Sequence, residues 1–277
     1  MQMSASRDLR SNVAVALDLI AQAADAGAQY IQTPEVTTLM ELDRTALFRA
    51  IEPEDSSAAL AAFRMAARDH SVWLHIGSMA VRVSADRLAN RSYLISPEGE
   101  IAARYDKIHM FDVELPNGES YRESLNYVPG TAAVVADLPW TRLGLTICYD
   151  LRFPYLHRAL AKAGAAIIAG PAAFTRTTGE AHWHALLRAR AIETQCFVLA
   201  AAQTGLHEMG RETYGHSLAV SPWGEILADG GTAVGVTMVE IDPAQAYEVR
   251  QRVPSLVHDR SFTVIEAAAD AGAGVEP

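Results

Sequence analysis

The chain has little cysteine and an excess of negative charge, and each of these features excludes a class of protein. Two cysteines occur among 277 residues, too few for a disulfide framework, so each thiol needs its own explanation. Lys and Arg number 23 against 33 Asp and Glu, which gives a formal net charge of −10. Basic residues do not gather in consecutive blocks, so we expect no nucleic-acid partner.

Long apolar runs are also missing. The longest segment without Asp, Glu, Lys or Arg runs from Thr194 to His207 and includes glutamine, glycine and histidine, which is unlike a membrane span. Near the start, Asp18 and Gln22 interrupt the apolar pattern, so it does not resemble a secretory signal. Apolar residues still make up 50% of the chain, enough to form a core without a structural metal. We therefore expect a folded cytoplasmic protein with no membrane partner.

Helical and strand patterns alternate along the chain, which favours an α/β protein. Val13, Leu17, Ile20 and Ala24 recur at helical spacing before a glycine, as in an amphipathic helix. Other helical patterns lie near 60–67, 155–163 and 182–194, and strand-like segments at 28–32, 72–78, 91–96, 101–105, 143–148, 165–169, 197–202, 217–220 and 233–241. We expect one domain over residues 1–266 and an Ala- and Gly-rich disordered tail over 267–277.

The segment 111–130 has turn residues and little periodicity. It contains Pro116, Asn117-Gly118 and Pro129-Gly130. A loop of this length inside a compact domain is usually either functional or disordered. We favour a functional loop.

Cys148 is the first candidate for chemistry. It follows an apolar strand pattern and precedes a helical one, so its thiol would lie at the carboxyl end of a strand and near the first turn of a helix. Amides there favour a thiolate and can stabilise an oxyanion. From spacing alone, a core position is still the slightly favoured interpretation of Cys148. It is strongly favoured for Cys196, which lies inside an apolar strand pattern.

A family resemblance distinguishes the two cysteines. The segment 144–154, which contains Cys148, resembles the nucleophile segment of the nitrilase superfamily, the carbon–nitrogen hydrolases. Thr33-Pro34-Glu35 resembles the segment that carries the family's general base. The segment 104–111, which contains Lys107, resembles the segment that carries the family's lysine. The segments 174–195, 200–203 and 214–217 look most like the branch of deaminated glutathione amidases and omega-amidases. The resemblance covers nearly the whole chain.

This resemblance implies a four-layer α-β-β-α sandwich and an amidase that needs no cofactor or metal. Cys148 would attack an amide carbonyl, ammonia would leave, and water would hydrolyse the thioester. Glu35 would act as general base. Lys107 and the backbone N–H of Tyr149 would stabilise the oxyanion, and Glu123 would orient the lysine and the substrate.

The resemblance also implies a set of substrate-binding residues. Arg152 would bind a carboxylate, because guanidinium offers a planar fork of donors, although an arginine after a strand is often a surface residue. Phe174 and Thr178 would lie at the same end of the substrate, and His109 and Tyr149 would line the pocket.

Other polar residues receive structural interpretations. His182 and His184, two residues apart on a helix, would point to different faces, so we expect no metal site from this pair. The remaining charged residues of the same helix are expected to form structural ion pairs: Arg188, Arg190 and Glu193.

Several substrates fit the hypothesis of a cysteine-dependent amidase. The favoured one is deaminated glutathione, and the alternatives are omega-amides such as 2-oxoglutaramate, or N-carbamoyl amino acids. A binding protein without turnover is disfavoured, because all four catalytic positions carry the required residue.

We expect subunits to pair as a homodimer, or a higher homo-oligomer, through a helical layer. Family members usually begin with a full strand, whereas here Met1–Ser4 starts almost inside the corresponding segment, so either the first strand is short or the natural start lies upstream.

Overall fold

A computed structural model of the protein describes residues 1–266, and the predicted tail, 267–277, lies outside the described residues. The first sheet combines one parallel and two antiparallel pairings. Its strands, in spatial order, are β1 (Tyr30–Gln32), β2 (Trp73–Arg82), β3 (Leu88–Ile95) and β4 (Ile101–Asp106). The β3–β4 hairpin confirms the pairing expected around residues 97–99.

The second sheet has a parallel centre and antiparallel edges. Its strands, in spatial order, are β14 (Ile226–Asp229), β13 (Leu218–Val220), β10 (Phe197–Ala200), β9 (Ile167–Ala169), β8 (Thr141–Leu145) and β7 (Val134–Leu138). The central strands are buried throughout or nearly so, which is why they read as continuous apolar runs in the sequence.

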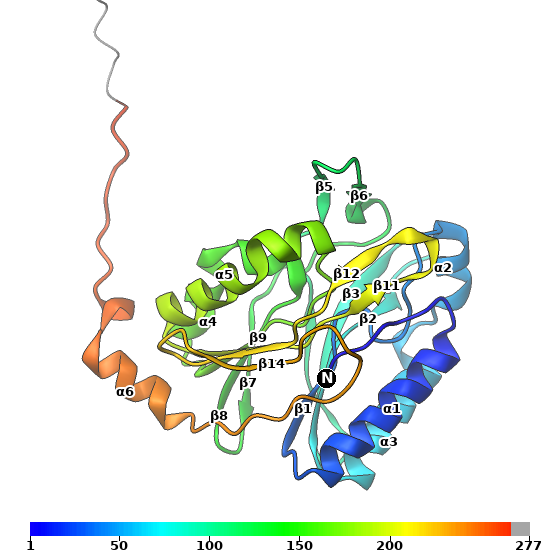
Figure 1. Cartoon of the computed structure of the whole chain (residues 1–277), viewed down its shortest axis with the longest axis horizontal. Helices are drawn as coiled ribbons and strands as arrows, with labels where there is room; N and C mark the ends of the chain where they lie inside the picture. Colours follow the sequence, from blue (N-terminus) through cyan, green and yellow to red (C-terminus); the bar gives the residue numbers. More distant parts are fainter. Residues whose placement is uncertain (267–277) are drawn as a thin grey trace, which may run out of the picture.

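Helices cover the outer face of each sheet (Figure 1). On the first sheet lie α1 (Leu9–Asp25) and α3 (Ala58–Asp69), and on the second α4 (Pro154–Lys162) and α5 (Arg176–Thr194). Two smaller helices are α2 (Arg44–Ala50) and α6 (Ala244–Arg252). The predicted four-layer sandwich is therefore confirmed. None of the described helices is long and apolar enough to cross a membrane.

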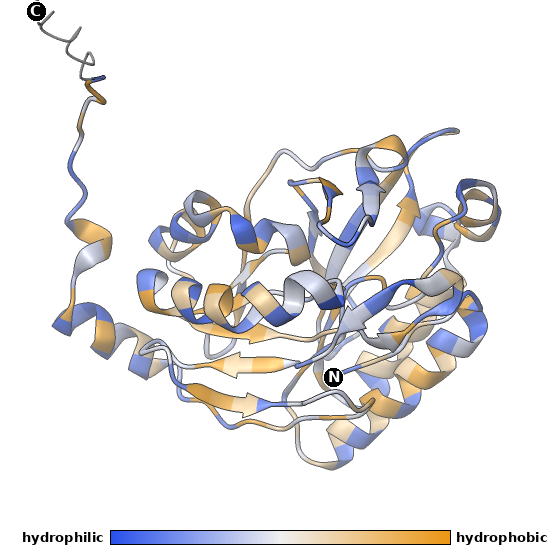
Figure 2. Cartoon of the chain, turned by 45° about the horizontal axis from the view of Figure 1, so that its top comes forward, coloured by the Kyte–Doolittle hydropathy of each residue, from blue (hydrophilic) through white to orange (hydrophobic). Residues whose placement is uncertain are grey.

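Apolar side chains join the layers. Ala16 and Ile20 of α1 pack with Leu74 of β2 on the outer face of the first sheet. Between the sheets, Leu94 and Tyr105 of the first sheet share a cluster with residues of β7, β8, β9 and β10. Figure 2 shows the resulting pattern, with apolar strands inside and helices that are striped apolar and polar. Because both sheets bury both faces, their strand ends are fixed relative to one another.

The helix predicted at 182–194 begins earlier in the structure. Helix α5 begins at Arg176 rather than near residue 182, because Thr175 caps it and accepts a hydrogen bond from the Thr178 N–H. The first turns of α5 are polar, so they lack the regular spacing of apolar residues from which the helix was predicted. Gly179 is required there, since an added Cβ would lie 2.3 Å from Tyr214.

The strand predicted at 233–241 was wrong. The chain turns at residues 221–224, where Gly224 N donates to Ser221 O at 2.9 Å, and β14 pairs with β13 directly after this turn. The later segment is irregular apart from a bridge between Gly235 and Gln2. Apolar content alone suggested a strand there, but the tight turn already provides the partner strand.

The remaining elements are short. In the predicted loop 111–130, a hairpin forms from β5 (Asp112–Glu114) and β6 (Ser120–Arg122), and a second hairpin forms from β11 (Thr204–Leu206) and β12 (Glu212–Tyr214). Short 3₁₀ helices lie at Glu54–Ser56, Glu123–Leu125, Cys148–Arg152, Glu208–Gly210 and Ser255–Val257. At the start of the chain, Gln2 and Met3 form isolated bridges.

Candidate active site

Cys148 lies on a sharp turn beyond the end of β8. Its φ of 48° is in the left-handed region, which is unusual for a residue with a side chain. Its N–H donates to Pro171 O at 2.8 Å, and the chain then enters the 3₁₀ helix and α4. A residue in such a conformation persists only where its surroundings hold it.

The carboxylate of Asp150 holds this turn. It is fully buried and accepts hydrogen bonds from Ile147 N at 2.9 Å and Tyr105 Oη at 2.6 Å on one oxygen. Its other oxygen accepts from His109 N at 3.1 Å and pairs with His109 Nδ1 at 2.6 Å. Asp150 thus ties the segment of Lys107 to the segment of Cys148.

His109 was predicted to line the pocket, and the structure places it elsewhere. Its ring stacks on Phe153 with centroids 3.5 Å apart and bonds to Asp150 and to the Tyr155 hydroxyl. It is not among the described residues that line the cavity. The Asp150 carboxylate holds the imidazole, so His109 supports the turn that carries Cys148 instead of lining the cavity.

Replacing Asp150 with asparagine is expected to lower the free energy of unfolding by about 1–3 kcal/mol, because an amide NH₂ would face at least one buried N–H donor. Urea unfolding followed by circular dichroism measures this. Asp137→Asn is the matched control, since that side chain is 80% exposed and such a change typically costs less than about 0.5 kcal/mol. Equal stabilities for the two variants would contradict the role given to Asp150.

Lys107 lies between two carboxylates. Its Nζ donates to Glu35 Oε1 at 3.0 Å and to Glu123 Oε2 at 2.8 Å, and its side chain is 2% exposed. Glu35 Oε2 also accepts from the Ala173 N–H at 2.9 Å. Both carboxylates and the ammonium are therefore fixed in place.

Asn90 belongs to the same cluster, and the sequence did not indicate it. Its Nδ2 donates to Glu35 Oε1 at 3.0 Å and to Glu123 Oε1 at 3.1 Å. Its Oδ1 is buried without a hydrogen-bond partner among the described residues. A single asparagine inside β3 carries no motif, so only its tertiary contacts reveal it.

The charges of this cluster determine its protonation. Burial favours a neutral Glu35, but the charge of Lys107 and hydrogen bonds from Cys148 and Lys107 bring the pKa of Glu35 below its ordinary value. Burial likewise opposes the charge of Lys107, yet Glu123 and Glu35 raise its pKa well above the ordinary value. Burial and the negative charge of Glu35 raise the pKa of the Cys148 thiol, against the opposing effect of Lys107. The resting site therefore holds a thiol beside a carboxylate that is ready to accept its proton.

These side chains line a cavity of about 260 Å³. The structure brings together there all but one of the residues that the sequence nominated: Glu35, Lys107, Glu123, Cys148, Tyr149, Arg152, Phe174 and Thr178. The segment 111–130 contributes further lining residues from Phe111 to Tyr127.

Three arginines line the cavity, and the first of them, Arg122, pairs with Glu114. The other two are Arg152 and Arg211. The Arg152 guanidinium lies 5.3 Å from the Phe174 ring centroid and bonds to His182 Nδ1 at 3.3 Å. Arg211, which the sequence did not indicate, lies 4.9 Å from the Tyr121 ring centroid and donates through Nη2 to Ala173 O at 2.6 Å. Its buried Nε has no hydrogen-bond partner among the described residues. Besides Lys107, the guanidinium groups of Arg152 and Arg211 thus add positive charge to the cavity lining.

Comparison with known proteins decides the family. The model of the carbon–nitrogen hydrolase family matches residues 1–251. The chain belongs to that family. This hydrolase is 43% identical to the deaminated glutathione amidase of Yersinia enterocolitica, over 94% of this chain and 91% of that protein.

Solved structures agree with this assignment. The hydrolase matches the Caenorhabditis elegans NitFhit protein with a TM-score of 0.87 and 36% identity, over 98% of this chain and 67% of that one. It also matches a variant of the Nesterenkonia sp. AN1 amidase in which acrylamide has added to the active-site cysteine, with a TM-score of 0.76 and 25% identity, over 92% of this chain and 96% of that one. The hydrolase is therefore an amidase of the nitrilase superfamily.

Proposed function

We propose that the protein hydrolyses the amide at the end of a small keto-acid chain, with deaminated glutathione as the favoured substrate, through a thioester on Cys148. The observation that carries this proposal is the convergence of Cys148, Glu35 and Lys107 in one cavity that Arg152 and Arg211 also line. The Yersinia relative, at 43% identity, supports the substrate.

In the first half-reaction Glu35 accepts the proton of the Cys148 thiol while the sulfur attacks the amide carbonyl carbon. The carbonyl π electrons move onto oxygen, and Lys107 Nζ and the N–H of Tyr149 stabilise that negative charge. The C–N bond then breaks as Glu35 returns the proton to the departing nitrogen. This leaves a thioester and a free amine.

In the second half-reaction Glu35 takes a proton from water, whose oxygen attacks the thioester carbonyl. Collapse of the second tetrahedral intermediate breaks the C–S bond, and the proton returns to Cys148. Glu123 and Asn90 take no proton in this scheme. They hold Lys107 and Glu35 where both half-reactions need them.

The leaving group depends on the substrate. Ammonia, which the sequence led us to expect, leaves from a primary amide such as 2-oxoglutaramate. Deaminated glutathione contains only secondary amides, so cleavage at its keto-acid chain releases a cysteine-containing dipeptide. Both substrates then yield 2-oxoglutarate, so one product assay serves for both.

Deaminated glutathione carries two carboxylates, and 2-oxoglutaramate carries one. Arg152 and Arg211 in the cavity lining suit a substrate with a carboxylate at each end, because guanidinium groups recognise carboxylates in a planar, two-point geometry. This match favours the larger substrate.

Steady-state formation of 2-oxoglutarate from the two substrates, measured side by side, tests the proposal. We expect a higher kcat/KM for deaminated glutathione. A higher value for 2-oxoglutaramate would make the protein an omega-amidase. N-carbamoyl amino acids yield no 2-oxoglutarate, so their turnover is followed by ammonia release. Turnover of these compounds alone would reject both keto-acid substrates, and turnover of none would overturn the substrate class.

Changing Arg152 to lysine is expected to raise KM for the favoured substrate about tenfold with kcat nearly unchanged, because an ammonium cannot reproduce the two-point contact with a carboxylate. Initial-rate kinetics measure this. The matched control is Arg188→Lys on α5. The Arg188 side chain bonds to Gly224 O, and Arg188 is not one of the described residues that line the cavity. An unchanged KM in Arg152→Lys would remove Arg152 from the substrate site.

Pairing of subunits remains a prediction. Ile192 of α5 is 51% exposed and Trp223, in the turn after β13, is 61% exposed. The two residues lie near each other, since a Cβ on Gly224, the neighbour of Trp223, would lie 2.6 Å from Ile192. Light scattering coupled to gel filtration is expected to give at least twice the 29.9 kDa chain mass, and a monomer mass would reject pairing.

A further inference from the structure

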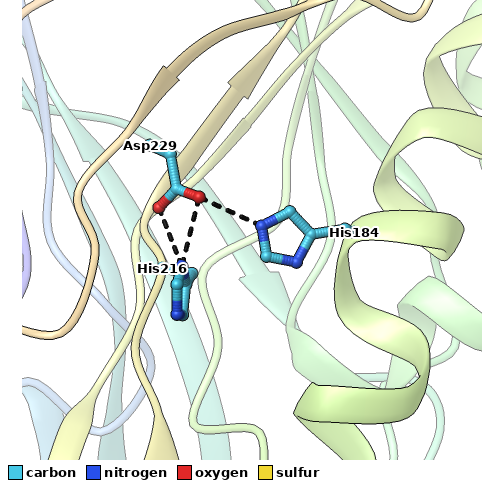
Figure 3. A group of neighbouring side chains, drawn as sticks. All are labelled: His184, His216 and Asp229. Carbon is cyan, nitrogen blue, oxygen red and sulfur yellow. Dashed lines mark hydrogen bonds and ion pairs between the residues drawn. The ribbon is translucent and has the colours of Figure 1, made fainter.

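Three side chains of the types that bind metal ions converge outside the catalytic cavity. They are His184 of α5, His216 in the loop between β12 and β13, and Asp229 at the end of β14 (Figure 3). His184 Nε2 lies 3.1 Å from Asp229 Oδ2, and His216 Nδ1 lies 2.9 and 3.1 Å from the two carboxylate oxygens. The three residues come from segments far apart in the sequence, so their meeting is a property of the fold.

The distances suit a single divalent transition-metal ion. One ligand atom from each side chain lies within 4.8 Å of the others. Tetrahedral Zn²⁺ with ligands at 2.0–2.1 Å would place those atoms about 3.3 Å apart. The carboxylate–imidazole distances of 2.9–3.1 Å would therefore need to lengthen only slightly to admit the ion. Two histidines and one carboxylate are a common ligand set for such ions.

Contacts behind the ligands hold this arrangement in place. The backbone of His216 is fixed on both sides, because its N–H donates to Gly231 O at 2.6 Å and its carbonyl accepts from Trp183 Nε1 at 2.8 Å. Asp229 Oδ1 also accepts from the Gly231 N–H at 2.8 Å. Supporting contacts of this kind orient ligands in metal sites.

The packing around the histidines limits their movement further. The Tyr214 ring stacks on His216 with centroids 4.5 Å apart and meets His184 edge-on at 5.9 Å. The ligand side chains are 24–31% exposed, so an ion can enter from solvent and water can complete its coordination. Deeply buried ligands would lack that route, and flexible surface histidines would lack the fixed geometry.

We propose that His184, His216 and Asp229 form a structural Zn²⁺ site that joins α5 to the β13–β14 hairpin. This site uses His184 of the His182–His184 pair considered from the sequence, but not His182. His182 contacts Arg152, so the two histidines do point to different sides of α5. The second and third ligands come from other elements, which is why helical spacing could not indicate the site.

Equilibrium dialysis of the full chain against Zn²⁺, with metal measured by mass spectrometry, tests the proposal. We expect one ion per chain and a higher Tm in the presence of Zn²⁺, because a ligand that binds only the folded state stabilises it. His184→Ala and Asp229→Asn should each weaken binding at least about tenfold and remove the rise in Tm. His70→Ala, at the end of α3 in the opposite helical layer, should bind as the unchanged protein does.

Thiols also bind zinc, so the dialysis is repeated with Cys148→Ala. One ion retained in Cys148→Ala and lost in Asp229→Asn supports the site. An ion that is lost in Cys148→Ala but kept in Asp229→Asn would place the metal at the catalytic thiol and overturn the proposal. Absence of stoichiometric binding would overturn it as well and leave a hydrogen-bonded cluster only. Circular dichroism without metal checks that both ligand variants fold.

Discussion

Cys148→Ala is expected to reduce 2-oxoglutarate formation from either substrate to the background rate. The substitution removes the atom that forms the thioester, and neither Glu35 nor Lys107 can replace a sulfur nucleophile in that step. Losing a nucleophile of this kind costs several orders of magnitude in kcat. The measurement is a coupled assay for 2-oxoglutarate with purified variant and unchanged protein at equal concentration.

The fold should survive this substitution. Cys148 is 7% exposed, so alanine removes one buried sulfur atom and leaves a small cavity. The left-handed φ of 48° burdens alanine about as much as cysteine, since both carry a Cβ. We expect the free energy of unfolding to change by less than about 1.5 kcal/mol, so lost activity cannot be attributed to unfolding.

Cys196→Ala is the matched control. That thiol is also buried, but it contacts Ala165 O and Arg250 beneath α4 and not the cavity. Activity should persist in Cys196→Ala. Turnover retained in Cys148→Ala, or lost equally in both variants, would contradict the assignment of the nucleophile.

Glu35→Gln should have two effects of opposite direction. Turnover is expected to fall by at least about a hundredfold, because glutamine cannot accept the thiol proton, protonate the leaving nitrogen or activate water. Alkylation of Cys148 by iodoacetamide at neutral pH is expected to become faster. A single variant thus separates the reactivity of the thiol from catalysis.

The second effect follows from the charges around the thiol. In the unchanged protein the thiolate would be the third negative charge beside one ammonium, after Glu35 and Glu123, and burial and the charge of Glu35 raise the pKa of Cys148. Removing the charge of Glu35 lowers that pKa while Lys107 still favours the anion. A lower pKa means more thiolate at neutral pH and therefore faster alkylation.

Alkylation rates measured across pH by mass spectrometry, together with kcat/KM, test both effects. Glu180→Gln serves as control, because that residue lies on the surface of α5 and pairs with Arg176. It should leave both quantities unchanged. Slower alkylation in Glu35→Gln would mean that Glu35 promotes ionisation of the resting thiol, contrary to the electrostatics described above.

The local sequence was enough to identify the three segments on which the catalytic proposal depends. An apolar strand followed by a polar turn and a helical pattern identifies the end of a strand, and this is where Cys148 lies. The residues that flank Glu35 and Lys107 resembled the corresponding family segments, and these segments occur along the chain in the order found in the family. The apolar alternation of strands and helices likewise predicted an α/β protein, because burial of a regular element leaves a periodic trace in its own residues. The two sheets with their helical layers were expected from the family resemblance.

Tertiary structure decided the contacts between those segments. Asn90 and Arg211 enter the cavity from a strand and a loop with no motif, and Asp150 draws His109 away from the cavity that it was expected to line. The start of α5 and the position of β14 also depended on a capping hydrogen bond and a tight turn rather than on apolar spacing. Sequence patterns record how each element buries its own side chains, whereas a site built from several elements depends on distances and charges that exist only once the layers have packed together.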